Sequence, residues 1–120
     1  MARQCLEKAI RITPHAGRVT VTFAGKLVAS STAALDLDEP GSPLRVYIPR
    51  ADVASEFLAD SGTHSTCPFK GEASYHSLQS GEVSARDAVW YYPDPCPLVE
   101  PIRDHLAFWG SAIRYDTAPV

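Results

Sequence analysis

Residues 67–71 (CPFKG) place a thiol and an ammonium group within four positions of each other. A cysteine becomes reactive when nearby cations stabilise its thiolate, and the candidate cations for Cys67 are Lys70, Arg50 and His64. We therefore take Cys67 as the candidate catalytic nucleophile.

The same segment also has a purely structural interpretation. Cys67 is then a small, buried apolar residue at the end of a strand, while Pro68 and Gly71 shape the turn and Phe69 anchors it in the core. The residues alone leave both interpretations of Cys67 open.

Arg50 and Lys70 are charged side chains that an apolar core excludes. They either bind an anion or form ion pairs with Asp52 or Glu72. We assign Arg50 and Lys70 as ligand-binding residues, because both lie within distinctive segments of the chain.

Aromatic residues supply candidate walls for a binding pocket, namely Tyr47, Tyr75, Trp90 and Tyr92. Aromatic faces with one or two cations suit a small, flat or anionic ligand, and a core aromatic cluster is the alternative. We assign Tyr75 and Trp90 as ligand-binding residues. Trp90 should be more than half-buried with a partner for its indole N–H, and strand alternation places Tyr92, not Tyr91, on its face.

The sequence contains few candidate metal ligands at useful spacing. His64-x-x-Cys67 supplies two ligands where structural zinc needs four. Asp36-x-Asp38 is the acidic pair nearest to a magnesium site, and we interpret it as a solvated rim. There is no glycine-rich phosphate loop. We predict no metal and no cofactor.

These residues must be positioned mainly by strands. Residues 18–23 alternate apolar and polar side chains with period two, which is typical of a half-buried strand, and a turn follows at Ala24-Gly25. The apolar spacing of residues 52–58 predicts a short helix, and residues 98–107 predict a second one. Other extended segments are 26–30, 33–37, 44–48, 64–69, a central hairpin of 72–79 and 82–92 with its turn at Ser80-Gly81, and 108–115.

Many short strands with one or two short helices predict a mainly β fold with antiparallel sheets. Within this pattern, residues 47–53 (YIPRADV), 66–75 (TCPFKGEASY) and 88–95 (AVWYYPDP) resemble, in order, the hallmark segments of the domain-of-unknown-function 427 family. The resemblance covers about residues 17–116.

The resemblance implies a β-tent-like fold, two antiparallel sheets that meet along one edge, as in methionine sulfoxide reductase B and the thalidomide-binding domain of cereblon. Many β-tent relatives hold zinc with two Cys-x-x-Cys pairs, which this chain lacks. His76 stands where the family often carries Trp. The family is sometimes labelled nucleotidyltransferase-like, a chemistry for which these residues provide no motif.

The length of 120 residues predicts a single domain, 1–120. A net charge of -3 provides no basic field for nucleic acid, and no apolar run is long enough for a membrane helix, so we expect neither partner. The odd set of Cys5, Cys67 and Cys96 predicts free thiols and a cytoplasmic protein.

Three functions fit these observations. The first is a pocket for a small-molecule or anionic ligand, with or without catalysis, built by Arg50, Cys67, Lys70, Tyr75 and Trp90. The second is a thiol redox enzyme similar to methionine sulfoxide reductase B, in which Cys96 would resolve Cys67. The third is a non-enzymatic interaction module, for which a homo-oligomer would form through an apolar patch or a sheet edge.

Overall fold

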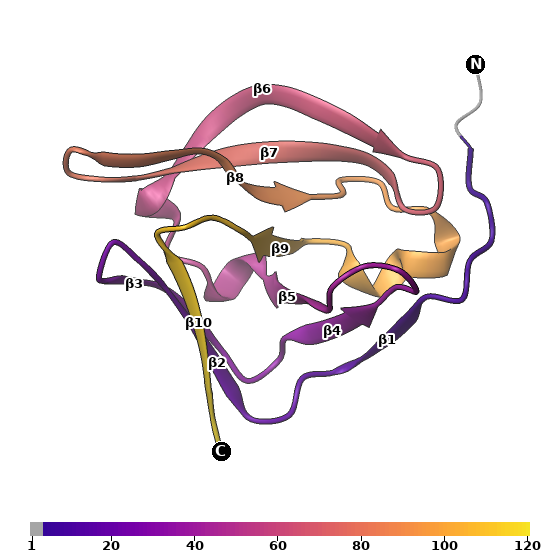
Figure 1. Ribbon diagram of the computed structural model, residues 1–120, viewed down its shortest axis with the longest axis horizontal. Coiled ribbons are helices and arrows are strands. Elements are labelled where there is room, and N and C mark those ends of the chain that lie inside the picture. Colours follow the sequence, from indigo (N-terminus) through magenta and orange to yellow (C-terminus); the bar gives the residue numbers. More distant parts are fainter. Residues whose placement is uncertain (1–3) are drawn as a thin grey trace.

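The computed structural model describes residues 4–120, whose ten strands form two antiparallel sheets (Figure 1). The large sheet has the order β1-β4-β5-β9-β8-β7-β6, and the small sheet has the order β10-β2-β3. The expected mainly β fold with two antiparallel sheets is confirmed. The strands are β1 (Arg11–Pro14), β2 (Arg18–Phe23), β3 (Lys26–Ser31), β4 (Leu35–Asp38), β5 (Arg45–Pro49), β6 (Leu58–Cys67), β7 (Gly71–Ser80), β8 (Val83–Tyr91), β9 (His105–Phe108) and β10 (Ile113–Ala118).

The small sheet follows directly from the alternating pattern of β2. Val19, Val21 and Phe23 are fully buried, while the threonines between them are only half-buried. The β2–β3 turn uses Ala24 and Gly25, both with positive φ, as two-residue hairpins require. The turn predicted at this position is confirmed.

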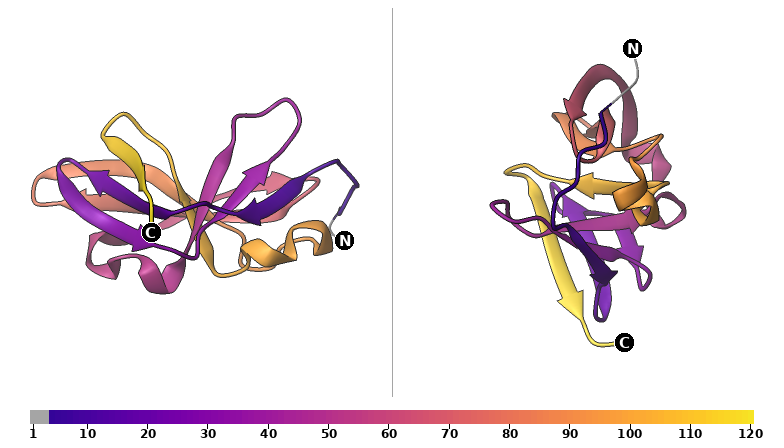
Figure 2. Two further views of the ribbon diagram at one scale, coloured as in Figure 1. Left: turned by 90° about the horizontal axis from the view of Figure 1, so that it is seen from below. Right: turned by 90° about the vertical axis from the view of Figure 1, so that its right-hand side faces the viewer.

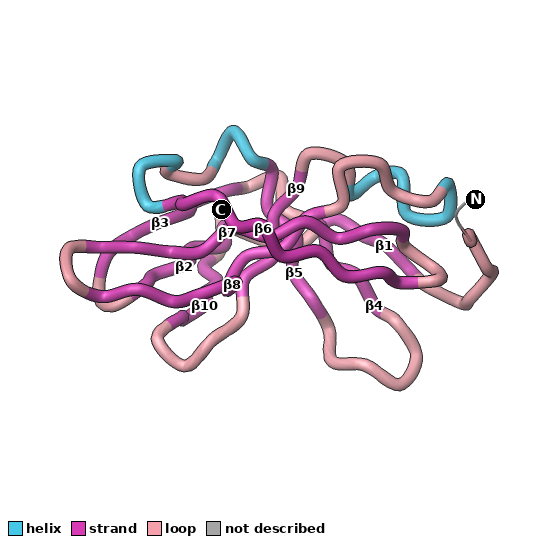
Figure 3. The backbone as a smooth tube through the Cα atoms, turned by 90° about the horizontal axis from the view of Figure 1, so that it is seen from above, coloured by secondary structure: helices cyan, strands magenta, loops and turns pink. Residues whose placement is uncertain are grey.

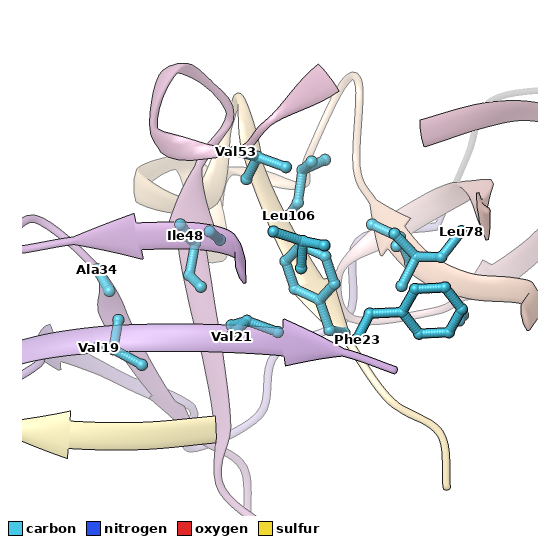
Figure 4. Packing of buried hydrophobic residues seen from close by; sticks show 13 residues of the cluster. Val19, Val21, Phe23, Ala34, Ile48, Val53, Leu78 and Leu106 are labelled. Atoms are coloured by element: carbon cyan, nitrogen blue, oxygen red, sulfur yellow. The ribbon is translucent and has the colours of Figure 1, made fainter. Parts of the chain in front are cut away.

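The main hydrophobic core lies between the two sheets (Figure 4). Val21 and Phe23 of the small sheet pack with residues such as Ile48, Leu78 and Leu106 of the large sheet. A second cluster of buried residues contains Leu37, Tyr47, Ala73, Tyr92, Val99, Ile102 and Ala107. The large sheet therefore contributes side chains to two separate apolar clusters.

The central hairpin is present, with its turn shifted by one residue from the expected position. Ser80 pairs with Val83, so the turn residues are Gly81 and Glu82. Gly81 has a φ of 59°, a conformation that glycine adopts without steric cost.

Neither predicted helix has the expected form. Residues 52–58 are replaced by two 3-10 helices, η1 (Arg50–Asp52) and η2 (Ser55–Phe57), before β6 begins at Leu58. Val53, between the two, instead forms a β-bridge with Ala29. Pairing with the neighbouring sheet therefore overrides the weak helical spacing of this short segment.

The second predicted helix, residues 98–107, is divided between a 3-10 helix and a strand. η3 (Pro97–Ile102) contains Pro101, which has no N–H to donate to a longer helix. Leu106 and Ala107 then lie in β9, where they pair with Ile48 of β5 and Trp90 of β8. Segment 108–115, predicted as one strand, is interrupted by a turn between β9 and β10.

Two loops, residues 39–44 between β4 and β5 and residues 109–112 between β9 and β10, extend to the same side of the large sheet (Figure 2). The 3-10 helices lie on the opposite side (Figure 3). This arrangement separates a side with two loops from a side with η1, η2 and η3. No helix within residues 4–120 has the length and apolar character needed to cross a bilayer.

Candidate ligand-binding site

A hollow of about 300 Å³ opens beside the 109–112 loop and has mainly aromatic walls. We call it the outer hollow. Its lining residues are Arg45, Tyr75, Asp87, Trp90, Tyr92 and Trp109. The structure thus brings together two of the predicted ligand-binding residues, Tyr75 and Trp90, with Tyr92.

Strand pairing places these aromatic residues on one face. Tyr75 of β7 and Trp90 of β8 are direct cross-strand partners, so their side chains project to the same side. Tyr91 stacks on His76 away from the hollow, with ring centres 4.8 Å apart. The expectation that Tyr92, and not Tyr91, shares the face of Trp90 is confirmed.

Trp90 is half-buried and its indole N–H donates a hydrogen bond to the hydroxyl oxygen of Tyr47 over 3.1 Å. The two rings meet edge to face, with an interplanar angle of 88°. Tyr47 is 1% exposed, and burial raises the pKa of its phenol to about 12. The expected partner of the Trp90 N–H is therefore a buried, neutral phenol.

Arg45 is the cation of the outer hollow and was not among the predicted site residues. Its guanidinium carbon lies 5.5 Å from the ring centre of Trp90, a cation–π contact. Among residues 4–120, no carboxylate forms an ion pair with Arg45. Arg45 and Tyr47 stand two positions apart on β5, so the alternation of the predicted strand contained a signal that could have identified Arg45.

A second, inner hollow of about 160 Å³ adjoins the outer one. The two share Arg45, Trp90 and Tyr92, and the remaining lining residues of the inner hollow are Leu37, Glu39, Ser42, Pro43, Tyr47 and Lys70. The 39–44 loop thus borders the inner hollow, and the 109–112 loop borders the outer hollow.

Glu39 is a buried carboxylate that binds two lysines. Lys70 and Lys8 each donate to one of its oxygens, and the Lys8 Nζ to Glu39 Oε2 distance is 2.8 Å. Burial acts to raise the pKa of Glu39, but the hydrogen bonds from Lys70 and Lys8 outweigh it and hold the pKa below its usual value. Lys70 therefore lines the inner hollow as a partner of Glu39, not of Glu72.

Arg50 lies apart from Lys70, Tyr75 and Trp90, with which we predicted that it shares a binding site. It belongs to η1, and its guanidinium stacks over Tyr91 at 4.6 Å and contacts Nε2 of His76 at 3.1 Å. Because Tyr91 and His76 project from the face opposite to Trp90 and Tyr75, Arg50 and Lys70 do not form one anion-binding pair. Arg45 occupies the position that we expected for Arg50.

His76 is a buried neutral imidazole rather than a wall of either hollow. Burial lowers its pKa, and the positive charge of Arg50 lowers it further. Its Nδ1 has no hydrogen bond within residues 4–120 and lies 3.5 Å from the exposed carboxylate of Asp60. The histidine therefore supports the packing of Arg50 and Tyr91.

Cys67 is half-buried and packs against the second apolar cluster, which contains Tyr47 and Tyr92. His64 lies three positions earlier on β6 and therefore projects to the opposite face, where it contacts Ser74 at 3.2 Å. Of the three candidate cations, His64 and Arg50 thus lie on the other face and Lys70 binds Glu39. This environment fits the structural interpretation of Cys67 better than the catalytic one.

The turn that follows Cys67 has the expected shape, but Phe69 does not lie in the core as we predicted. Gly71 has a φ of 113°, a conformation that side-chain-bearing residues rarely adopt. Phe69 is half-buried beneath the ammonium group of Lys8, 4.9 Å from its ring centre, and belongs to neither apolar cluster.

The expectation of three free thiols is wrong for two of the cysteines. Cys5 and Cys96 form a disulfide across a sequence separation of 91 residues. Such a pairing depends on how the tertiary structure places the N-terminus, which spacing alone does not reveal. Cys96 is consequently not a free thiol that could resolve Cys67.

Asp87 and Trp109 complete the outer hollow, and neither was among the predicted site residues. Asp87 has a φ of 55° within β8, and its carboxylate accepts hydrogen bonds from the hydroxyls of Ser61 and Thr63, which lower its pKa. Trp109 is 68% exposed on its loop. Neither the positive φ of Asp87 nor the position of Trp109 on its loop has a signature in the sequence.

The structure offers little to a metal ion. No group of three or more His, Cys, Asp or Glu side chains within residues 4–120 could hold one. Asp36, half of the acidic pair noted above, contacts Nδ1 of His15 at 2.7 Å.

Comparison with protein-family models matches residues 11–118 to a domain of unknown function, DUF427. The resemblance inferred from three short segments is confirmed, over a slightly longer stretch than the expected residues 17–116. No curated protein matches the chain.

Proposed function

Because this chain belongs to the domain-of-unknown-function 427 family, whose description assigns no activity, we propose its function from the site itself: it binds a small ligand that carries a flat ring and an anionic group. The outer hollow receives the ring, and Arg45 with the inner hollow receives the anion.

The aromatic walls support the first half of this proposal. Tyr75, Trp90 and Tyr92 line the outer hollow, and aromatic side chains bury a large area of a flat ligand. A volume of about 300 Å³ lies at the lower end of the range for small-molecule sites. The hydroxyl of Tyr75 contacts Ser65 at 2.8 Å, which restrains the ring at the wall of the hollow.

The position of Arg45 is the main support for the second half of the proposal, the binding of the anionic group. Its guanidinium lies over Trp90 at the junction of the two hollows, and it forms no ion pair with a carboxylate within residues 4–120. A planar guanidinium with free N–H groups binds a carboxylate or phosphate through two parallel hydrogen bonds. A ligand ring against Trp90 would have its anionic group within reach of Arg45.

The inner hollow adds donors for the same anion. The ammonium group of Lys70 lines it, and the hydroxyl of Tyr47, which accepts from Trp90, has its own hydrogen to donate. Because the pKa of Tyr47 is about 12, this hydroxyl stays protonated at neutral pH. Glu39 does not repel the anion strongly, since Lys8 and Lys70 together exceed its charge.

A fluorescence titration tests the proposal, because Trp90 and Trp109 both line the outer hollow. Benzoate serves as the probe and benzamide as its neutral analogue. We expect benzoate to quench or shift the emission saturably, and benzamide to bind about tenfold more weakly, as the loss of one charge-assisted hydrogen-bonded contact implies.

Arg45→Gln should reduce benzoate affinity by about tenfold and leave benzamide affinity nearly unchanged. Arg18→Gln is the matched control, since Arg18 is exposed on β2 and lines neither hollow. Equal benzoate affinity in the wild type and Arg45→Gln would refute the assignment of the anion to Arg45.

The exposure of Trp109 and Leu44 favours a second candidate function, an interaction surface for another copy of the chain. Both residues border a further hollow of about 280 Å³ and are 68% and 55% exposed. Sedimentation of the wild type and Trp109→Ser tests this candidate, because an interface centred on Trp109 predicts a dimer that the variant loses.

A further inference from the structure

The N-terminal segment, residues 4–10, has neither helix nor strand and runs beside the turn between β6 and β7 (Figure 1). The N–H of Leu6 donates to the carbonyl of Pro68 over 2.8 Å, and the ammonium of Lys8 lies over Phe69. Leu6 itself is 49% exposed, so its side chain adds little apolar anchoring. The segment lies before residue 11, where the family match begins.

The Cys5–Cys96 disulfide is the one covalent cross-link between this segment and the rest of residues 4–120. Cys5 is exposed, whereas Cys96 is fully buried. The N–H of Cys96 donates to the carbonyl of Lys70 over 2.9 Å, which ties the buried half of the disulfide to the residue that lines the inner hollow. The disulfide therefore lies beside the turn that carries Lys70, and one of its two cysteines is an exposed residue.

Lys8 connects the segment to the candidate site. Its ammonium binds one oxygen of Glu39, and Lys70 binds the other. Glu39 and Lys70 both line the inner hollow. Lys8 thus contributes one positive charge to a site that it does not line.

We propose that the Cys5–Cys96 disulfide is a reversible redox switch that holds Lys8 on Glu39 when oxidised and releases it when reduced. The charge next to the inner hollow then falls by one unit on reduction. The consequence for ligand affinity rests on the proposed function, whereas the release of Lys8 does not.

The reductant is a dithiol, and the exchange balances without another reactant. A thiolate of the dithiol attacks Sγ of the exposed Cys5, the Cys5–Cys96 bond breaks, and Cys96 leaves as a thiolate that takes up a proton. The second thiol of the dithiol then attacks the mixed disulfide and releases Cys5 as a thiol. The dithiol is oxidised to a disulfide, and its two hydrogens end on Cys5 and Cys96.

Release follows from the weakness of the remaining contacts. The disulfide anchors the chain at Cys5, three positions before Lys8, and β1 anchors it from Arg11, three positions after Lys8. Both anchors keep Lys8 at high effective concentration beside Glu39, and reduction removes the first of them. Without it, the segment is held by the hydrogen bond from Leu6 to Pro68, by the Lys8 ammonium on Glu39 and over Phe69, and by the partial packing of Ile10 on the second apolar cluster. A chain terminus with so few anchors frays readily. Lys70 lies within the β6–β7 turn and stays on Glu39 in both states.

Two measurements without ligand test the switch. Amine acetylation of the oxidised and the dithiol-reduced protein should label Lys8 about threefold faster after reduction, as the loss of a weak ion pair implies, while exposed Lys26 reacts equally in both. Carbon-13 titration of Glu39 should show a higher carboxyl pKa after reduction. In Lys8→Gln, the pKa of Glu39 should be raised already in the oxidised protein and should not respond to reductant.

Cys5→Ser provides the reduced state without a reductant, and circular dichroism checks that it and the reduced wild type keep the β fold. Unchanged Lys8 labelling and an unchanged Glu39 pKa on reduction would overturn the switch. Loss of the β signal in both reduced forms would also overturn it, because the disulfide would then hold the whole fold together.

Benzoate affinity separates this proposal from the proposed function. We expect the dissociation constant to rise roughly two- to fivefold on reduction, which corresponds to one partly screened charge. If Lys8 is released but benzoate binds neither form, the switch stands and the proposed ligand class fails. If benzoate binds both forms equally and Lys8 labelling does not change, the switch fails and the binding site stands.

Discussion

The indole N–H of Trp90 and the hydroxyl oxygen of Tyr47 lie 3.1 Å apart, which joins β8 to β5 at the wall shared by the two hollows. Tyr47 belongs to the second apolar cluster, and Trp90 packs against it. One hydrogen bond therefore positions both the aromatic wall and a buried proton donor.

Tyr47→Phe removes the acceptor of the Trp90 N–H. We expect the free energy of unfolding to fall by about 1–3 kcal/mol, because a partly buried donor loses its partner. Urea unfolding followed by tryptophan emission measures the change. Tyr91→Phe is the control and should differ from the wild type by no more than about 0.5 kcal/mol. An equal loss in both variants would show that the bond contributes nothing specific.

Alkaline pH should destabilise the protein through Tyr47. Its folded pKa of about 12 exceeds the unfolded value of about 10, so between these values the unfolded chain releases a proton that the folded chain keeps. The contribution is complete below pH 10 and is lost as the pH rises through about 12. Urea midpoints measured across this range should fall less steeply in Tyr47→Phe than in the wild type, and parallel curves would contradict this assignment.

Acidic pH should destabilise the protein through Glu39. Its folded pKa lies below the ordinary value of 4.5, so the contribution is present above pH 4.5 and is lost as the pH falls through the folded pKa. Glu39→Gln removes the charge that pairs with Lys8 and Lys70, and we expect a loss of about 1–3 kcal/mol at neutral pH. Acid unfolding curves of the variant should show a weaker pH dependence below pH 4.5 than those of the wild type.

Arg50→Ala should lower stability without affecting the hollows. The guanidinium stacks on Tyr91 and contacts His76, and we expect a loss of about 1–2 kcal/mol. Benzoate affinity should remain that of the wild type, because Arg50 projects to the other face. Arg50→Lys keeps the charge but not the planar stack, and should recover only part of the stability. Weaker benzoate binding in Arg50→Ala would contradict this expectation and show that Arg50 contributes to the binding site.

Cys5→Ser should lower the free energy of unfolding by about 2–4 kcal/mol, since the wild-type disulfide constrains a long loop of the unfolded chain. Urea unfolding of the wild type and of Cys5→Ser measures this difference in stability. The difference should be present without reductant and should disappear when reductant is added. Cys67→Ser is the matched control and should keep its sensitivity to reductant. Under non-reducing conditions, alkylation of the wild type should modify Cys67 and leave Cys5 and Cys96 unlabelled until the disulfide is reduced.

The sequence by itself determined the features that depend on neighbouring residues. The period-two pattern of 18–23 reappears as β2, and the central hairpin reappears as β7 and β8 with a one-residue shift of its turn. Strand alternation also placed Tyr92 with Trp90, because side chains of successive residues in a strand must point to opposite faces. Two of the predicted binding residues, Tyr75 and Trp90, met because they are direct cross-strand partners in this hairpin.

Only the tertiary structure decided the features that depend on distant segments. Ala29 and the β5–β9–β8 pairings turned two predicted helices into 3-10 turns and a strand, since sheet pairing outweighs weak helical spacing. Lys8 reached Glu39 and Cys5 reached Cys96 because residues 4–10 run beside the β6–β7 turn, and no local pattern encodes that path. Arg45 rather than Arg50 became the cation of the site because η1 carries Arg50 to the opposite side of the large sheet.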